Sequence, residues 1–132
     1  MSYQHAIVWI DHVHATVIDF AVDDKHVHLV EREGEDRRIH RKSGIPGAGK
    51  AADDPKFFDA VVKAIGNARE VLIVGPGNAK LSFNHDLERH HAKVATRVVG
   101  VESLDHPSNG ELLAFARKYF KKYDALHGEL PA

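Results

Sequence analysis

The sequence predicts an α/β fold built around a mixed sheet of five strands. The first observation is the unbroken apolar run at residues 71–74, which is typical of a strand buried on both faces. The second is the sharp stop that Gly75-Pro76-Gly77 imposes on it before a long amphipathic segment, so that strand passes directly into helix. The third is the alternating, turn-punctuated pattern of residues 6–31, which indicates a meander of antiparallel strands.

The meander is predicted from short strands separated by short turns. Residues 6–10 are uniformly apolar and form the first strand, and residues 11–14 resemble a turn. Residues 15–20 alternate into a second strand, and Asp23-Asp24 marks the next turn. Residues 26–31 alternate again and form the third strand.

The first helix carries local signals at both of its ends. Asp53 or Asp54 can serve as the N-cap, and Pro55 suits the first helical position. Apolar residues follow at helical spacing, and Gly66-Asn67 ends the helix before the buried strand.

The second half of the chain repeats the alternation of helix and strand. We expect a helix over about 79–92, a β-branched strand over 96–101, and a last helix capped by Ser108, with Glu111 completing a capping box. Right-handed crossovers make the fourth and fifth strands parallel to the first. The simplest assembly is a sheet in the order 3-2-1-4-5 with helices on its faces, which is the ribonuclease H-like layout. Residues 1–132 are expected to form a single domain.

Composition narrows the classes of function. The chain has 132 residues, a formal net charge of -1 and no cysteine, which excludes disulfides and thiolate metal sites. The N-terminus lacks the pattern of a signal peptide, and no apolar run reaches transmembrane length. We therefore expect a cytoplasmic protein without a membrane partner, and nothing in the sequence calls for a cofactor.

A polar, basic, glycine-rich loop at residues 33–54 is the best candidate for contact with a partner. Within it, residues 44–51 nearly match a phosphate-binding P-loop, but Ala51 lacks the hydroxyl that a magnesium ion needs. The loop's cations suit the phosphates of RNA, although a solvated charge run would look the same. The predicted RNA-binding residues of this loop are Arg37, Arg38, His40, Arg41, Lys42 and Lys50.

A second candidate is the turn after the buried strand. Gly75 and Gly77 lie at the carboxyl end of a central strand and next to a helix N-terminus, where backbone N–H groups favour anions. Lys80, at the start of that helix, is expected to add a positive charge to the RNA-binding surface.

Two other classes of function remain open. Asp11, with His12 and His14, follows the first strand where a metal-dependent nuclease or hydrolase would place a carboxylate; Asp59 and Asp105 are the available partner acids. The eleven histidines otherwise suit a surface without acid partners, and no HExxH motif is present. The third class is a protein-interaction module that forms a homodimer through a sheet edge or a helix face.

Three short stretches, in order, carry a resemblance to a known family. They are Ile10-Asp11-His12-x-x-Ala15, Gly44-Ile45-Pro46-Gly47 and Val74-Gly75-Pro76-Gly77-x-x-Lys80. Together with the order of elements, they make the chain similar to the central domain of archaeal and eukaryotic class-1 peptide-chain release factors and of Pelota-type ribosome-rescue factors. It looks most like the small bacterial translational machinery proteins related to that domain.

The resemblance implies a translation-associated role but not peptide release. In release factors the loop after the third strand carries Gly-Gly-Gln, whereas this loop has no glutamine and Gln4 is the only one in the chain. Pelota-type proteins also lack Gly-Gly-Gln and act by binding. The resemblance therefore implies a non-enzymatic protein that docks on the ribosome, tRNA or other structured RNA through its basic loop.

Overall fold

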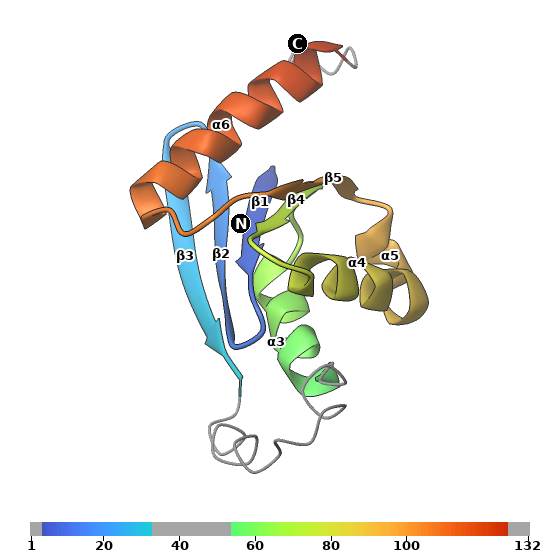
Figure 1. Ribbon diagram of the computed structural model, residues 1–132. Coiled ribbons are helices and arrows are strands. Elements are labelled where there is room, and N and C mark those ends of the chain that lie inside the picture. The colour runs from blue at the N-terminus through green and yellow to red at the C-terminus, as the bar shows by residue number, and fades with distance from the viewer. Residues whose placement is uncertain (1–3, 33–53, 127–132) are drawn as a thin grey trace.

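The computed structural model describes residues 4–32 and 54–126, and it places a five-stranded sheet between two layers of helices (Figure 1). The strands are β1 (His5–Ile10), β2 (His14–Ala21), β3 (Asp24–Glu31), β4 (Glu70–Gly75) and β5 (Val98–Ser103). The helices are α3 (Pro55–Ile65), α4 (Ala79–His90), α5 (Ala92–Ala95) and α6 (Asn109–Leu126). No helix in these described ranges combines the length and the apolar character that crossing a membrane requires.

The sheet has the predicted order, β3-β2-β1-β4-β5. β1 and β2 pair antiparallel, as do β2 and β3, whereas β4 is parallel to both β1 and β5. In the centre of the sheet, Ile7 lies opposite Ile18 on one side and Leu72 on the other. All six residues of β4 are buried, which confirms the prediction of a strand covered on both faces.

Each face of the sheet has its own core, because successive side chains of a strand point to opposite sides. Val8 and Ile10 belong to the core under α3 and α4, where Phe83 and Leu87 of α4 are fully buried. Ile7 and Trp9 belong to the core under α6, with Phe120. Figure 1 shows α6 crossing the sheet on the opposite side from α3 and α4.

The predicted helix caps are confirmed where the structure describes them. The side chain of Asp54 accepts hydrogen bonds from the backbone N–H groups of Lys56 (3.1 Å) and Phe57 (3.4 Å), so Asp54 is the N-cap of α3. The last helix has its capping box. The Ser108 hydroxyl accepts from the Glu111 N–H at 3.1 Å, and the Glu111 carboxylate accepts from the Ser108 N–H at 2.9 Å.

One helix differs from its prediction. The segment predicted as a single helix over 79–92 ends at His90, because His91 leaves the helical region with φ -139° and ψ 59°. The short helix α5 follows and is closed at Thr96, whose hydroxyl donates to the Lys93 carbonyl at 2.8 Å. The fifth strand therefore starts at Val98, two residues later than expected.

Candidate functional site

One edge of the sheet gathers most of the features that the sequence singled out. β1 and β3 both run antiparallel to β2, and β4 is parallel to β1, so these strands end at the same edge. α4 begins there, shortly after β4, and so does α3, whose N-cap Asp54 lies 3.5 Å from Arg32 at the end of β3. We call this the carboxyl edge. In α/β sheets it is the usual place for ligands, since helix N-termini and loops meet there.

The two ends of the predicted RNA-binding loop lie together at the carboxyl edge. Arg32 precedes residues 33–53 and Asp54 follows them, and the Arg32 Nε lies 3.5 Å from the Asp54 Oδ2. The Arg32 backbone N–H donates to the Val13 carbonyl at 2.9 Å, and its guanidinium lies 5.7 Å from the centre of the Phe57 ring. Arg32 and Asp54, which flank residues 33–53, thus lie beside the turn between β1 and β2; the end of β3 and the start of α3 are at the lower end of Figure 1.

The cations predicted for RNA binding fall into two groups. Those of the loop, Arg37, Arg38, His40, Arg41, Lys42 and Lys50, lie outside the described residues, and their role stays a prediction. Lys80 is described and only 8% exposed. Its ammonium group donates a hydrogen bond to the Gly77 carbonyl, which ties the start of α4 to the preceding turn. Sequence spacing could not reveal this contact, because it depends on the path of the turn.

The turn at Gly75 and Gly77 is shaped by a close approach of two strands. A Cβ atom on Gly75 would lie 2.2 Å from the carbonyl oxygen of Ile10. Only glycine therefore fits at this position, where the end of β4 passes β1. The Gly75 carbonyl in turn accepts from the Leu104 N–H at 3.0 Å. Gly77 has open space around its Cβ position. The two glycines predicted for the same anion-binding turn therefore have different surroundings.

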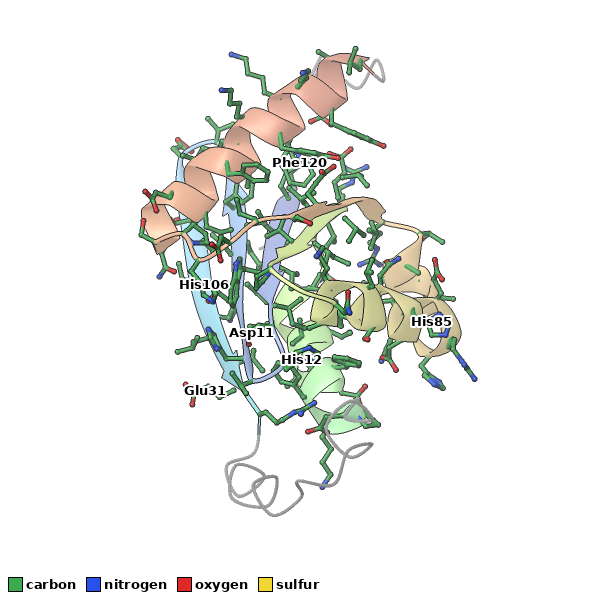
Figure 2. The ribbon with its side chains drawn as sticks, in the orientation of Figure 1. Asp11, His12, Glu31, His85, His106 and Phe120 are labelled. Atoms are coloured by element: carbon green, nitrogen blue, oxygen red, sulfur yellow. The ribbon has the colours of Figure 1, made fainter. Side chains whose placement is uncertain are left out.

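Asp11 acts as a turn residue in this structure. Its carboxylate accepts hydrogen bonds from the N–H groups of Val13 (2.9 Å) and His14 (2.8 Å), an arrangement typical of aspartate in turns. The His14 Nδ1 lies 3.4 Å from the same oxygen, while His12 is exposed. Figure 2 shows Asp11 and His12 on this turn, away from His85 on α4.

The acids that a hydrolase would need at Asp11 have other partners. Asp59 lies 2.9 Å from the His91 Nε2, and Asp105 lies 2.8 Å from the His106 Nδ1. Within residues 4–32 and 54–126, no group of histidine and carboxylate ligands forms around Asp11. The described geometry therefore does not favour metal-dependent hydrolysis at the first turn.

The expectation of histidines without acid partners is wrong for several of the described ones. His91 and His106 pair with the aspartates just named, and His28 lies 3.1 Å from Asp19. Burial raises the pKa of the Asp19 carboxyl, against the opposing effects of His28 and His26. The Asp59–His91 pair was missed because its members are 32 positions apart, whereas Asp105 and His106 are neighbours in the sequence.

A further cluster lies around the single tryptophan. The ring of Trp9 lies between the imidazoles of His14 (5.1 Å between centroids) and His106 (5.0 Å). Its Nε1–H donates to the Asp105 carbonyl at 2.6 Å. These contacts join the first turn to the segment that follows β5, again at the carboxyl edge.

A ligand-like group outside the predicted sites lies at the opposite, amino edge of the sheet. His5 and Glu70 are the first residues of β1 and β4, and Asp124 lies near the end of α6. No local motif signals this group, because its three members are brought together only by the parallel pairing of β1 with β4 and by the path of α6.

Comparison with known proteins reveals likeness at the level of structure. No protein-family model matches the sequence, and no curated protein matches it. Among solved structures, the fold resembles Pelota from Archaeoglobus fulgidus, with a TM-score of 0.62 and 12% identity over 89% of this chain. It also resembles the archaeal translation termination factor aRF1 (TM-score 0.55, 16% identity, 82% of this chain) and Pelota from Thermoplasma acidophilum (0.52, 21%, 80%).

The likeness defines a class of fold rather than an activity. The chain spans about a third of the length of each neighbour, 32%, 32% and 29% respectively. At such identities the shared property is the fold, and function has to be argued from the site. The resemblance to the release-factor and Pelota domain that the sequence motifs suggested is confirmed as a structural likeness.

Proposed function

We propose that this chain is a non-enzymatic, translation-associated protein that binds the ribosome, tRNA or other structured RNA through its basic loop. The observation that supports the proposal is the position of Arg32 and Asp54, the described residues at the two ends of that loop. Both residues lie at the carboxyl edge of a fold shared with Pelota and with a factor described as an archaeal translation termination factor.

The charges favour a nucleic-acid partner over an acidic protein surface. The chain as a whole carries a formal charge of -1, so attraction to polyanions must come from a local concentration of cations. Residues 37–42 supply four arginine and lysine side chains within six positions, together with His40. Such a cluster suits a phosphate backbone, which presents closely spaced negative charges.

The absence of Gly-Gly-Gln from the loop favours a binding role over peptide release. The loop contains no glutamine at any position, so the group that release factors bring to the peptidyl-transferase centre is missing. Phosphate contacts position a protein without chemistry of their own. We therefore expect this protein to act by occupying an RNA site, without catalysing a reaction there.

The proposal is tested by co-sedimentation with ribosomal subunits and by tRNA anisotropy over a salt series. The test variant reverses Arg37, Arg38, Arg41 and Lys42 to glutamate. Each lost phosphate contact lowers the slope of log affinity against log salt by about 0.7 to 0.9, so four lost contacts lower it by about 3. We expect the variant to lose binding while keeping its circular dichroism spectrum and unfolding midpoint.

A matched control separates the loop from general charge. Reversal of four exposed lysines elsewhere, Lys63, Lys118, Lys121 and Lys122, changes the net charge by the same amount. This control should retain the salt-dependent binding, apart from a weak long-range effect. The proposal fails if the wild-type protein shows no affinity at low salt, or if the control loses binding as completely as the loop variant.

A further inference from the structure

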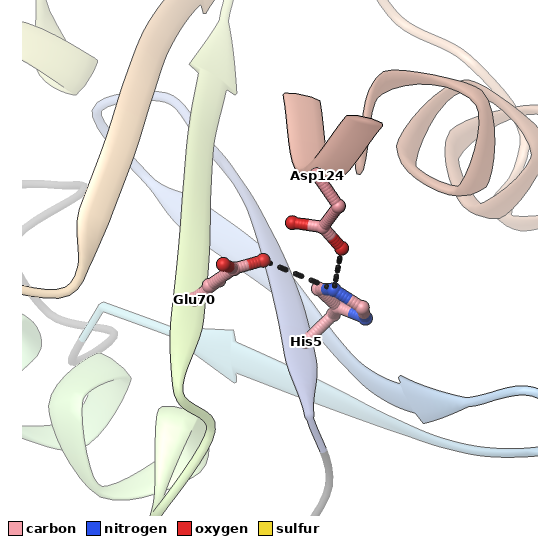
Figure 3. A group of neighbouring side chains, drawn as sticks. All are labelled: His5, Glu70 and Asp124. Atoms are coloured by element: carbon pink, nitrogen blue, oxygen red, sulfur yellow. Dashed lines mark hydrogen bonds and ion pairs between the residues drawn. The ribbon is translucent and has the colours of Figure 1, made fainter. Parts of the chain in front are cut away.

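The amino edge of the sheet holds three potential metal ligands from three separate elements. His5 begins β1, Glu70 begins the neighbouring strand β4, and the pairing register places them side by side. Asp124 reaches them from the last turn and a half of α6, one helical turn beyond the buried Phe120. Figure 3 shows the carboxylates of Glu70 and Asp124 both directed at the ring of His5.

The three ligand atoms converge on one point. The His5 Nε2 lies 3.1 Å from the Glu70 Oε1 and 3.3 Å from the Asp124 Oδ2, and all three ligand atoms lie within 4.8 Å of one another. In a tetrahedral zinc site with bonds of about 2.0 to 2.2 Å, neighbouring ligand atoms are about 3.4 Å apart. The separations of 3.1 and 3.3 Å from the His5 Nε2 are close to that value.

Two carboxylate oxygens compete for one imidazole nitrogen in this group. A single N–H at Nε2 carries one proton, yet two carboxylate oxygens approach it. The Asp124 Oδ1 is also buried without a hydrogen-bond partner. The two carboxylates lie in a largely buried place, where the Glu70 side chain is 9% exposed and a negative charge is costly.

The imidazole is held in an orientation suited to a ligand. Its ring lies 4.3 Å from the ring of Phe120 and 5.4 Å from that of Phe20, measured between centroids. These aromatic neighbours fix the plane of the ring and leave Nε2 pointing at the two carboxylates. A fixed ligand geometry is what a specific metal site needs.

We propose that His5, Glu70 and Asp124 bind a divalent transition-metal ion, with Zn²⁺ as the best match. Two carboxylate oxygens and one imidazole nitrogen are ordinary zinc ligands, and water completes the fourth position. The ion neutralises the two carboxylates and clamps the end of α6 onto the amino edge of β1 and β4. Its role is structural, because the site joins three elements and lies at the edge opposite Arg32 and Asp54, between which the basic loop runs in the sequence.

The test measures Zn²⁺ binding to untagged, full-length protein by calorimetry after treatment with EDTA, with Co²⁺ absorption as a second probe. The test variants are Glu70→Gln and Asp124→Asn, which keep the size of each side chain. The matched control is Asp59→Asn, which removes a carboxylate paired with His91 at 2.9 Å. Since even outer-sphere partners are worth about 10- to 100-fold in metal affinity, we expect each test variant to bind Zn²⁺ at least about 100-fold more weakly and the control to be unchanged.

Stability in the absence of metal provides an independent readout. Zn²⁺ at about 100 times its dissociation constant should raise the melting temperature of the wild type by roughly 5 to 10 °C and leave the two test variants unmoved. With EDTA, Asp124→Asn should be at least as stable as the wild type, because it removes one of two adjacent carboxylates.

Two outcomes overturn the proposal. Equal Zn²⁺ affinity in the wild type and in both test variants means that surface histidines bind the metal adventitiously. Failure of the wild type to bind Zn²⁺ also overturns it; a marked loss of stability in metal-free Asp124→Asn would then mean that the three side chains form an ion-paired group.

Discussion

Replacement of Gly75 by alanine tests how the carboxyl edge is built. The added Cβ would lie 2.2 Å from the Ile10 carbonyl oxygen, whereas an ordinary carbon–oxygen contact is about 3.3 Å or longer. The missing distance of about 1 Å has to come from separating the backbones of β4 and β1, because no side-chain rotation relieves a clash between two backbones. Both strands are central in the sheet, so this movement also disturbs the cores on its two faces.

We expect Gly75→Ala to lower the free energy of unfolding by about 3 kcal/mol, the upper part of the usual range for overpacking. The assay is urea unfolding followed by the fluorescence of Trp9, the single tryptophan, which is 3% exposed in the folded protein. With a denaturant dependence of about 2 kcal/mol per molar urea, the midpoint should fall by about 1.5 M.

Gly77→Ala is the matched control for this substitution. Apart from Gly77 and its chain neighbours, no described atom lies within 4 Å of this Cβ position. Gly77 does not have a positive φ, since Gly66 is the single glycine with positive φ among the described residues. The control should therefore be neutral, or it should stabilise the protein by about 0.4 to 1 kcal/mol because alanine lowers the conformational entropy of the unfolded chain. If the two variants unfold at the same urea concentration, the steric account of Gly75 is wrong, and its place in the turn needs another explanation, such as close approach of an anion.

Two further substitutions test electrostatics and capping. Burial raises the pKa of the Asp19 carboxyl above its ordinary value of 3.8, so the folded protein holds this proton more tightly than the unfolded chain. The stability that this protonated carboxyl contributes is fully present below pH 3.8 and is lost as the pH rises through the folded-state pKa. Asp19→Asn cannot lose a proton, so its stability should not show this fall with rising pH. If the urea midpoints of the wild type and Asp19→Asn change in parallel with pH, the raised pKa of Asp19 is contradicted. Ser108→Ala removes the hydroxyl that accepts from the Glu111 N–H at 3.1 Å and should cost about 1 kcal/mol of unfolding free energy, while Ser82→Ala, inside α4, should cost less.

The order of elements could be predicted from the sequence because its signals are local. The buried run of β4 is a short apolar stretch bounded by glycine and proline, and the caps of α3 and α6 lie within three residues of the groups that they bind. The right-handed preference of crossover connections then leaves few possible strand orders, and the simplest of these is the order that the structure shows. The break between α4 and α5 was missed because His91 has no helix-breaking character of its own; its carboxylate partner, Asp59, comes from α3.

Contacts that depend on the path of the chain could not be predicted in the same way. Lys80 has the sequence context of an exposed cation at a helix start, yet its ammonium group folds back onto the Gly77 carbonyl. Gly75 has the context of a flexible turn, yet it is required by the position of the Ile10 carbonyl on another strand. In both cases the deciding partner is set by how the chain passes itself, which residue types and spacing do not specify.

The two proposals concern opposite edges of one sheet, and this separation makes their tests independent. His5 and Ile10 mark the two ends of β1, which are about 16 Å apart at about 3.3 Å per residue. Sites at such a distance without shared partners contribute nearly additively, so loss of the metal ligands should change stability but not the salt dependence of RNA binding. Reversal of the loop charges should likewise leave Zn²⁺ affinity unchanged. Only long-range coupling through the sheet would link the two, and a metal-dependent change in RNA affinity would be its signature.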